Sequence, residues 1–224
     1  MKPMTEKHLA ILRRHMVEIV EMHFDLAADE IGGETLDPAL RRALLEVPRH
    51  LFVPSSLAAF AYQDGPLPIG FDKTISQPFI CAVMLQLAGI GPDMRVLEVG
   101  TGLGYQAALM AEMGAEVFSV EVVEEFAEAA EARFKALGQE VQVKVGDGSR
   151  GWPEHEPFER IIVTAAAPEP PRELVDELAP GGPLVIPLGG QGVQLLSVVE
   201  KSAAGAAEVR PVMPVRFTRL ELVS

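Results

Sequence analysis

The sequence predicts an α/β protein with a mostly parallel sheet, and three observations support this class. From about Met94 onwards, short apolar segments alternate with segments of helical spacing. The first apolar segment runs directly into a group of glycines. Strands that alternate with helices form right-handed crossovers, which give a parallel sheet covered on both faces. The last apolar segments have no helix between them, which predicts an antiparallel edge.

The elements of this alternating region follow from its apolar periodicity and its turn residues. We expect strands at 95–100, 115–121, 141–148, 158–166, 183–189, 193–200 and 212–220. We expect helices at 105–114, 122–138 and 170–182, with glycines near their ends.

Residues 1–92 differ in character and predict helices and loops. Apolar residues at helical spacing indicate a first helix with a buried stripe, namely Leu9, Leu12, Met16, Ile19 and Val20. Asp37 and Pro38 are typical of the start of a second helix. Segment 64–70 is rich in glycine and proline, which predicts a loop. We expect residues 1–92 and the core at 93–224 to form one compact domain.

The composition excludes several classes of protein. The 224 residues carry a formal net charge of −13, so the chain repels phosphate backbones and we expect no nucleic-acid partner. The single cysteine, Cys81, lies in a short apolar run and reads as a buried small side chain, which suits a reducing compartment. No run is long enough to span a membrane, and the N-terminus has no signal-peptide pattern. We therefore expect a soluble cytoplasmic protein.

A glycine motif follows the first strand of the alternating region. Gly100, Gly102 and Gly104 lie where parallel strands end, which is the ligand-binding edge of such sheets. The dinucleotide fingerprint requires a glycine at position 105, where this chain has Tyr105. Glu98 adds a carboxylate that would repel a pyrophosphate and favour a cation such as S-adenosylmethionine.

Acidic residues end the next two strands as well. Glu121 can accept hydrogen bonds from both hydroxyls of a ribose, although a carboxylate also suits the start of a helix. Asp147 lies between two glycines and can accept a hydrogen bond from an adenine amine, although it can equally be a turn residue. Together with the glycine motif, these positions favour a nucleoside-containing ligand.

Several segments, in order along the chain, resemble the protein-L-isoaspartate O-methyltransferase family. They are Val47 to Pro54, Asp64 to Gly70, Thr74 to Pro78, Glu98 to Ala108, Gly146 to Gly148 with Gly151 and Trp152, and Ile162 to Ala166. The run from Thr74 to Pro78 discriminates best, because methyltransferases in general share only the glycine motif. The chain departs from the family pattern at Lys73, where Gln is common, and at Arg219, where Pro is common.

The resemblance implies a class I S-adenosylmethionine-dependent methyltransferase with a Rossmann-like, seven-stranded, mostly parallel sheet and an N-terminal helical addition that carries an active-site loop. It implies methylation of the free α-carboxylate of L-isoaspartyl (or D-aspartyl) residues in damaged proteins, which starts repair through a succinimide. S-adenosylhomocysteine is the other product. The implied cofactor-binding residues are Thr74, Ile75, Glu98, Gly100, Thr101, Gly102, Gly104, Glu121, Val122, Asp147 and Gly148.

The resemblance makes Ser76 the active-site residue. A model α-carboxyl has a pKa of about 3.3–3.7, so the substrate is already ionised at neutral pH and needs no strong base. In an extended segment Thr74 and Ser76 share one face. We interpret Ser76 as orienting the substrate carboxylate, with Thr164, Ala165 and Ala166 lining the same site through their backbone amides.

Other chemistries receive less support. His8, His15 and His23 are spaced too widely for a metal site, and we expect no metal. Trp152 is expected to anchor the loop after Asp147. The alternatives are a carboxyl methyltransferase acting on an aspartate of one dedicated peptide, a nicotinamide-dependent oxidoreductase and a non-catalytic relative. We expect a monomer whose partners are isoaspartyl-containing proteins.

Overall fold

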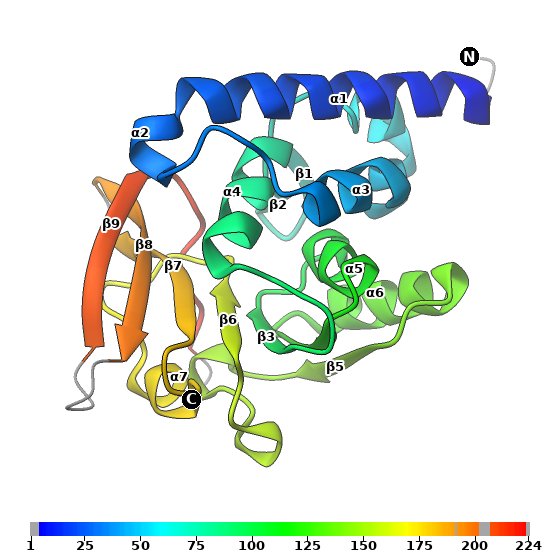
Figure 1. Cartoon of the computed structure of the whole chain (residues 1–224). Helices are drawn as coiled ribbons and strands as arrows, with labels where there is room; N and C mark the ends of the chain where they lie inside the picture. The colour runs from blue at the N-terminus through cyan, green and yellow to red at the C-terminus, as the bar shows by residue number, and fades with distance from the viewer. Residues whose placement is uncertain (1–4, 191, 202–206, 223–224) are drawn as a thin grey trace.

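A seven-stranded sheet forms the centre of the computed structural model, which describes residues 5–190, 192–201 and 207–222. Its order is β5-β4-β3-β6-β7-β8-β9 (Figure 1). The strands are β3 (Arg95–Val99), β4 (Glu116–Glu121), β5 (Val141–Val145), β6 (Arg160–Val163), β7 (Pro183–Gly189), β8 (Gln194–Lys201) and β9 (Ala207–Val215). The first five strands of this order, β5, β4, β3, β6 and β7, run parallel to one another. Strand β8 is antiparallel to both β7 and β9. The predicted parallel sheet with an antiparallel C-terminal edge is confirmed.

The parallel strands β3, β4, β6 and β7 bury both faces, because successive side chains point to opposite sides, whereas the edge strand β5 is only partly buried. Val96, Val117 and Ile162 belong to the larger core, which also contains the N-terminal helices. Leu97 and Phe118 belong to a second core on the other face, against the helix α7. This accounts for the nearly continuous apolar runs by which the strands were recognised.

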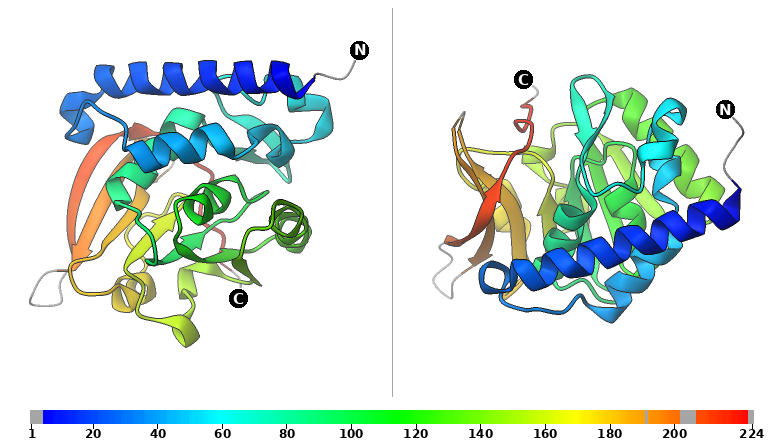
Figure 2. Two further views of the ribbon diagram at one scale, coloured as in Figure 1. Left: turned by 45° about the vertical axis from the view of Figure 1, so that its right-hand side comes forward. Right: turned by 90° about the horizontal axis from the view of Figure 1, so that it is seen from above.

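The helices cover the sheet and extend above it (Figures 1 and 2). They are α1 (Glu6–Leu26), α2 (Ala28–Ile31), α3 (Pro38–Glu46), α4 (Pro78–Ala88), α5 (Tyr105–Glu112), α6 (Glu124–Leu137) and α7 (Arg172–Glu177). Short 3₁₀ turns are η1 (Arg49–Phe52), η2 (Ser55–Phe60), η3 (Gly148–Arg150) and η4 (Pro153–His155). The predicted start of α3 is confirmed, because the Asp37 side chain accepts hydrogen bonds from the amides of Ala39 and Leu40.

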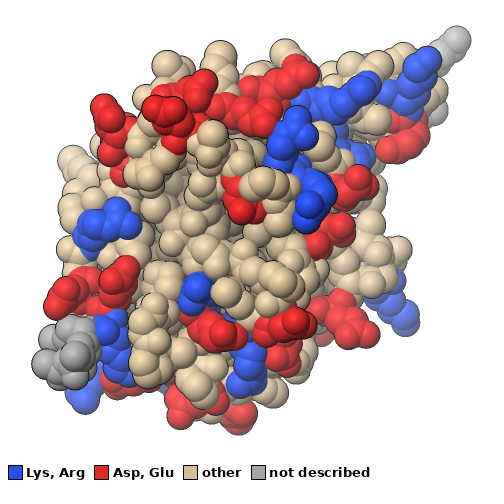
Figure 3. All heavy atoms as spheres, in the orientation of Figure 1, with Lys and Arg blue, Asp and Glu red and all other residues tan. Residues whose placement is uncertain are grey.

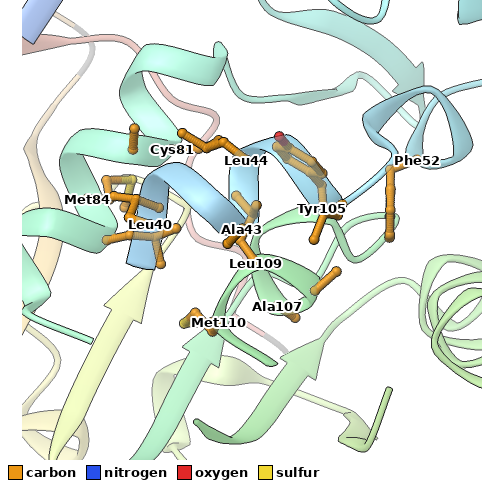
Figure 4. Close-up of a cluster of buried hydrophobic side chains, with 14 of the residues drawn as sticks. Leu40, Ala43, Leu44, Phe52, Cys81, Met84, Tyr105, Ala107, Leu109 and Met110 are labelled. Carbon is orange, nitrogen blue, oxygen red and sulfur yellow. The ribbon is translucent and has the colours of Figure 1, made fainter. Parts of the chain in front are cut away.

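The N-terminal helices share one core with the sheet. Figure 4 shows Leu40 and Leu44 of α3 meeting Met84 of α4 and Leu109 of α5, and all four side chains are fully buried. Burying a large apolar side chain contributes about 1.5–3 kcal/mol, so this contact holds the helical addition firmly against the sheet. The active-site segment that precedes α4 is therefore fixed at both ends.

One prediction for residues 1–92 is wrong, because the segment contains a β-hairpin. Strands β1 (Leu67–Gly70) and β2 (Lys73–Ile75) pair antiparallel. Phe71 and Asp72 form the turn with positive φ angles of 47° and 55°. Prolines and glycines within β1 disfavour a strand in a sequence-based prediction, although they are tolerated in a short two-stranded hairpin.

The last strand is also placed differently from the prediction of 212–220. It starts earlier, at Ala207, and ends at Val215. Beyond it, the amide and carbonyl groups of Phe217 are bonded to the side chain of Gln194, at 2.7 and 3.1 Å, in place of a neighbouring strand. The chain thus leaves the sheet and turns back, and Ala166 pairs with Arg219 in an isolated bridge. The helix predicted at 170–182 covers only Arg172–Glu177.

Charged side chains are spread over the surface. On the face seen in Figure 3, acidic and basic residues lie in small groups around a largely uncharged middle. Among the described residues, none of the helices combines the length and apolar character that crossing a membrane requires.

Candidate active site

The glycine loop between β3 and α5 has a backbone that only glycine adopts easily. Gly100, Gly102 and Gly104 have φ angles of 96°, 55° and 96°. A Cβ atom on Gly100 would lie 2.3 Å from the hydroxyl of Thr164, so that glycine lets two strand ends approach each other. A Cβ on Gly102 would meet only Ile69, at 3.4 Å, and would project into the open space beside the loop.

A cavity of about 580 Å³ lies at this edge of the sheet, and we call it the main cavity. The predicted site residues that line it are Thr74, Gly100, Gly102, Glu121, Val122, Gly148, Thr164 and Ala165. An adjoining inner cavity is lined by Thr74, Ile75, Ser76, Glu98, Gly100, Thr101, Gly102 and Thr164. Residues from five different predicted segments therefore converge on one place.

Glu121 holds the glycine loop to the end of β4. Its Oε2 accepts a hydrogen bond from the Gly102 amide at 2.7 Å, and its Oε1 accepts one from the Val123 amide at 3.0 Å. The residue is 5% exposed and lines the main cavity. A carboxylate oxygen can accept more than one hydrogen bond, so Glu121 can still receive ligand hydroxyls.

Glu98 is fully buried beneath the loop. It lies opposite Ser119 in the β3–β4 register, and Ser119 donates a 2.5 Å hydrogen bond to Oε2. The hydroxyls of Ser119 and Thr101 are 2.6 Å apart. Oε1 has no partner among the described residues. Burial, reinforced by the negative charge of Glu121, raises the pKa of Glu98 to about 8 although the Ser119 hydrogen bond opposes this.

The role expected of Glu98 stays a prediction. A carboxylate that favours a cationic ligand was expected beside the loop, and in the protein without ligand the pKa of this carboxyl group is raised to about 8. The raised pKa arises because the sheet and the loop exclude water from the side chain. A cation placed against Oε1 would favour the ionised form.

Asp147 mainly shapes the turn after β5. Its Oδ1 accepts hydrogen bonds from the amide and hydroxyl of Ser149, at 3.0 and 2.7 Å. Its neighbour Gly148 lines the main cavity, and a Cβ there would lie 2.3 Å from a methyl group of Val99. The alternative reading of Asp147 as a turn residue is confirmed, and its hydrogen bond to an adenine stays a prediction.

Ser76 lies between β2 and α4 and is held by two buried charged residues. Fully buried Arg49 donates hydrogen bonds to the carbonyl oxygens of Ser76 and Ala61, at 2.7 and 2.8 Å. Asp64 accepts hydrogen bonds from the side chain of Gln77, at 2.8 Å, and from the amide of Phe79, at 2.9 Å. The backbone around Ser76 therefore has little freedom to move.

The same network reaches the first helix. The Nδ1 atom of His23 in α1 lies 2.7 Å from a carboxylate oxygen of Asp64. The guanidinium of Arg49 lies over the ring of Tyr105, 4.7 Å from its centroid. Sequence reasoning did not assign Arg49 or Asp64 a role, although both fall within segments that carry the family resemblance. Long-range contacts of this kind have no local signal in a sequence.

The end of β6 supplies a hydroxyl but few free amides. The Thr164 hydroxyl donates to the carbonyl of Gly100 at 2.7 Å, and the Thr164 amide donates to Val99 at 2.9 Å. The Ala166 amide donates to the carbonyl of Thr218 at 2.8 Å. These two amides therefore donate within the protein, and a role of residues 164–166 in substrate binding stays a prediction. Strand pairing and the returning C-terminal segment occupy both amides, and Ala166 lines none of the cavities described here.

The C-terminal segment is the part of the site that sequence reasoning missed. Thr218, Arg219, Leu220 and Glu221 line the main cavity. Glu221 forms an ion pair with Lys73 of the hairpin, which lines the same cavity. Lys73 is thus already paired, so it does not act as a free charge at the rim. The family pattern at position 219, where Pro is common and this chain has Arg219, was the available signal.

Of the remaining candidates, Trp152 lies away from the cavities, whereas Cys81 lines the inner cavity. Trp152 packs edge-on against Phe118, with ring centroids 5.7 Å apart, and its amide donates to Glu177. Cys81 is buried, and this burial raises the pKa of its thiol to about 11, so it is a thiol and not a nucleophilic thiolate at neutral pH. Within the described residues, no group of three or more His, Cys, Asp or Glu side chains is arranged to hold a metal ion.

Comparison with known proteins identifies the family. A family model described as protein-L-isoaspartate(D-aspartate) O-methyltransferase matches residues 27–222. The chain belongs to this family. It is 46% identical over 219 residues to protein-L-isoaspartate O-methyltransferase 1 of Polaromonas sp. strain JS666, with 97% of this chain and 93% of the relative covered. It is 50% identical over 184 residues to the corresponding enzyme of Gloeobacter violaceus, with 81% and 89% covered.

Solved structures agree with this family. A protein-L-isoaspartate O-methyltransferase superposes with a TM-score of 0.77 at 28% identity, and the match covers 92% of this chain and 65% of that one. A putative protein-L-isoaspartate O-methyltransferase from Plasmodium falciparum, in complex with S-adenosylhomocysteine, superposes with a TM-score of 0.72 at 26% identity, covering 83% and 91%. The chain has the class I methyltransferase fold and is an S-adenosylmethionine-dependent carboxyl O-methyltransferase of the protein-L-isoaspartate type.

The cavity fits S-adenosylmethionine on its own chemistry. The unpartnered Oε1 of Glu98 offers a buried acceptor for a cationic group. Gly102 leaves open the space that any other side chain would fill. Glu121 presents a carboxylate to the same space. These features match a ligand that combines positive charge with sugar hydroxyls.

Proposed function

We propose that the main and inner cavities hold S-adenosylmethionine and that its methyl group faces the junction beside Ser76. Glu121 would bind the ribose hydroxyls, and Glu98 would bind the cationic end. Gly148, together with the segment 218–221, would enclose the nucleoside. Thr74 and Thr164 line both cavities, so the two cavities adjoin at these residues. This supports a single ligand that occupies both.

A third opening, which we call the Ser76 groove, meets the cavities at the same two threonines. It is lined by Thr74, Ser76 and Thr164 on one side and by residues 214–218 on the other. This junction is the observation that carries the proposal, because it joins the main cavity to the Ser76 groove beside the serine. We propose that an isoaspartyl residue enters from the groove and that its carboxylate lies against the Ser76 hydroxyl.

The residues of the chain then need only bind and orient the substrate carboxylate. The substrate carboxylate is ionised at neutral pH, so the site needs no general base. When bound, S-adenosylmethionine supplies a sulfonium methyl group for attack by a carboxylate oxygen, and the bonding pair stays on sulfur. Ser76 orients the carboxylate, while Arg49 and Asp64 keep Ser76 in place. Such positioning contributes up to about 7–11 kcal/mol in favourable systems.

The natural substrates are proposed to be many damaged proteins, not one dedicated peptide. The Ser76 groove is lined by residues 214–218 of the C-terminal segment as well as by Ser76, and we propose that a peptide chain lies along this segment. The ester formed from an isoaspartyl carboxylate closes to a succinimide, whose hydrolysis returns part of the residue to normal aspartate.

Replacing Ser76 by Ala tests the role of the hydroxyl. We expect kcat to fall by about 10- to 100-fold, which is the usual cost of losing one hydrogen bond to a charged group. The dissociation constant of S-adenosylhomocysteine should stay unchanged. Ser55→Ala, at an exposed position outside these cavities, is the matched control. An unchanged kcat in Ser76→Ala would remove the serine from the mechanism.

A further inference from the structure

The Ser76 groove continues beyond the active site. Part of its lining, Pro214 to Phe217, also borders a second hollow next to β8, which we call the distal hollow. The distal hollow is lined in addition by Val193, Gln194 and Arg219. Pro214, Val215, Arg216 and Phe217 line both spaces. A peptide that places one residue at Ser76 can therefore extend past Arg216.

The charged residues that line the Ser76 groove and the distal hollow are all positive. Arg216 is the charged residue that lines the Ser76 groove, and Arg216 and Arg219 are those that line the distal hollow. No described Asp or Glu lines either space. This is unusual for a chain with a net charge of −13, whose surface as a whole repels acidic peptides.

Arg216 is both available and firmly placed. Its side chain is exposed, and within the described residues it has no ion-pair partner, unlike Lys73, which is paired with Glu221. The next residue, Phe217, is fixed by two hydrogen bonds to Gln194. The backbone beside Arg216 is therefore held in place, while its unpaired side chain still loses rotamer entropy when it binds a ligand.

We propose that Arg216, with Arg219 beside it, selects isoaspartyl substrates that carry an acidic side chain a few residues from the damaged position. This rests on the proposed function, because it takes Ser76 as the place of the reacting carboxylate. The acidic side chain is a second carboxylate on the same peptide, and it pairs with Arg216 while the first lies at Ser76. A basic flanking residue would meet the same guanidinium and be repelled.

Synthetic isoaspartyl peptides that differ only in flanking charge test the proposal. Glu or Lys is placed two or three residues from the isoaspartyl residue, on each side in turn. An exposed ion pair gives about a two- to fivefold preference, so kcat/KM should favour the Glu peptide by that factor on one side of the isoaspartyl residue. The preference should shrink in high salt because exposed charges are screened.

Variants then assign the preference to one side chain. Arg216→Gln should bring the ratio of the two kcat/KM values close to one, and Arg216→Glu should invert it. Arg210→Glu is the matched control, because Arg210 is an exposed arginine of β9, the strand that Arg216 directly follows, and it lines neither space. In Arg210→Glu the ratio should stay as in the unmodified protein. Thermal unfolding of each variant checks that its fold is kept.

Three results would overturn the proposal. Equal kcat/KM values for Glu and Lys peptides on both sides would show that the arginine does not select. A fall in both values with an unchanged ratio in Arg216→Gln would place Arg216 at the reacting carboxylate instead. Methylation of no isoaspartyl peptide at all, with cofactor bound, would contradict the proposed function itself, which distinguishes that failure from the other two.

Discussion

Replacing Glu98 by Gln should remove a pH dependence of cofactor binding that the buried carboxyl group creates. In the free protein the pKa of Glu98 is raised to about 8, so the group is mostly neutral at pH 7. The cationic cofactor favours the ionised form, because its charge would lie near the unpartnered Oε1. Binding and loss of the proton are therefore linked.

The size of the effect follows from that pKa. At pH 7 a group with a pKa of about 8 is about 90% protonated, so binding should release about 0.9 proton. Below pH 8 the ionised fraction falls about tenfold for each pH unit, and the dissociation constant should rise by up to that factor. Above pH 8 the contribution of Glu98 to this change should vanish. The dissociation constant should therefore start to rise near pH 8 and rise further as the pH falls.

Isothermal titration calorimetry measures both quantities. Titrations of S-adenosylmethionine in two buffers with different ionisation enthalpies give the number of protons released, and a series from pH 6 to 9 gives the pH profile. Glu98→Gln should bind more weakly at pH 8.5 and show no proton release at pH 7. Glu112→Gln, an exposed residue of α5, is the control. A flat profile in the unmodified protein, or proton release retained in Glu98→Gln, would refute the reasoning.

Two further predictions concern the residues that shape the site. Arg49→Met should lower the free energy of unfolding by about 2–5 kcal/mol in urea titrations, because two buried carbonyl oxygens each lose their donor. Arg49→Met should also lower kcat, and Arg49→Lys should keep part of the kcat that Arg49→Met loses. A kcat of Arg49→Met equal to that of the unmodified protein would contradict the positioning role. Gly102→Ala should weaken cofactor binding about tenfold, which corresponds to about 1.4 kcal/mol, because the added methyl group would occupy space that the proposed cofactor site needs. Gly138→Ala, with a similar φ of 68° and open surroundings, should share the backbone strain and leave the affinity unchanged.

Most of the sheet could be predicted because its strands carry a strong local signal. Segments such as Arg95–Val99 and Arg160–Val163 are apolar, short and separated by helices, and both are buried strands. The end of β9 could not be predicted in this way. The sequence from Val212 to Leu220 keeps strand-like residues, but the side chain of Gln194 takes the backbone groups of Phe217 and ends the strand.

The location of the site was predictable, whereas its electrostatics were not. Glycines and acidic residues at strand ends indicate a ligand edge whatever the tertiary contacts are. The protonation of Glu98 depends on how completely it is buried, and the placement of Ser76 depends on Arg49, which is 27 positions away in the chain. Likewise, the residues that cover the cavity, Thr218 to Glu221, arrive from the far end of the chain.

Methylation of one synthetic peptide in its isoaspartyl and its normal aspartyl form tests the central claim most directly. Both forms are supplied with S-adenosylmethionine, and base-labile methyl ester is counted. The account predicts strong methylation of the isoaspartyl form alone. Methylation of neither form, with cofactor binding confirmed by calorimetry, would contradict it and would favour a dedicated peptide substrate or a protein that has lost the reaction.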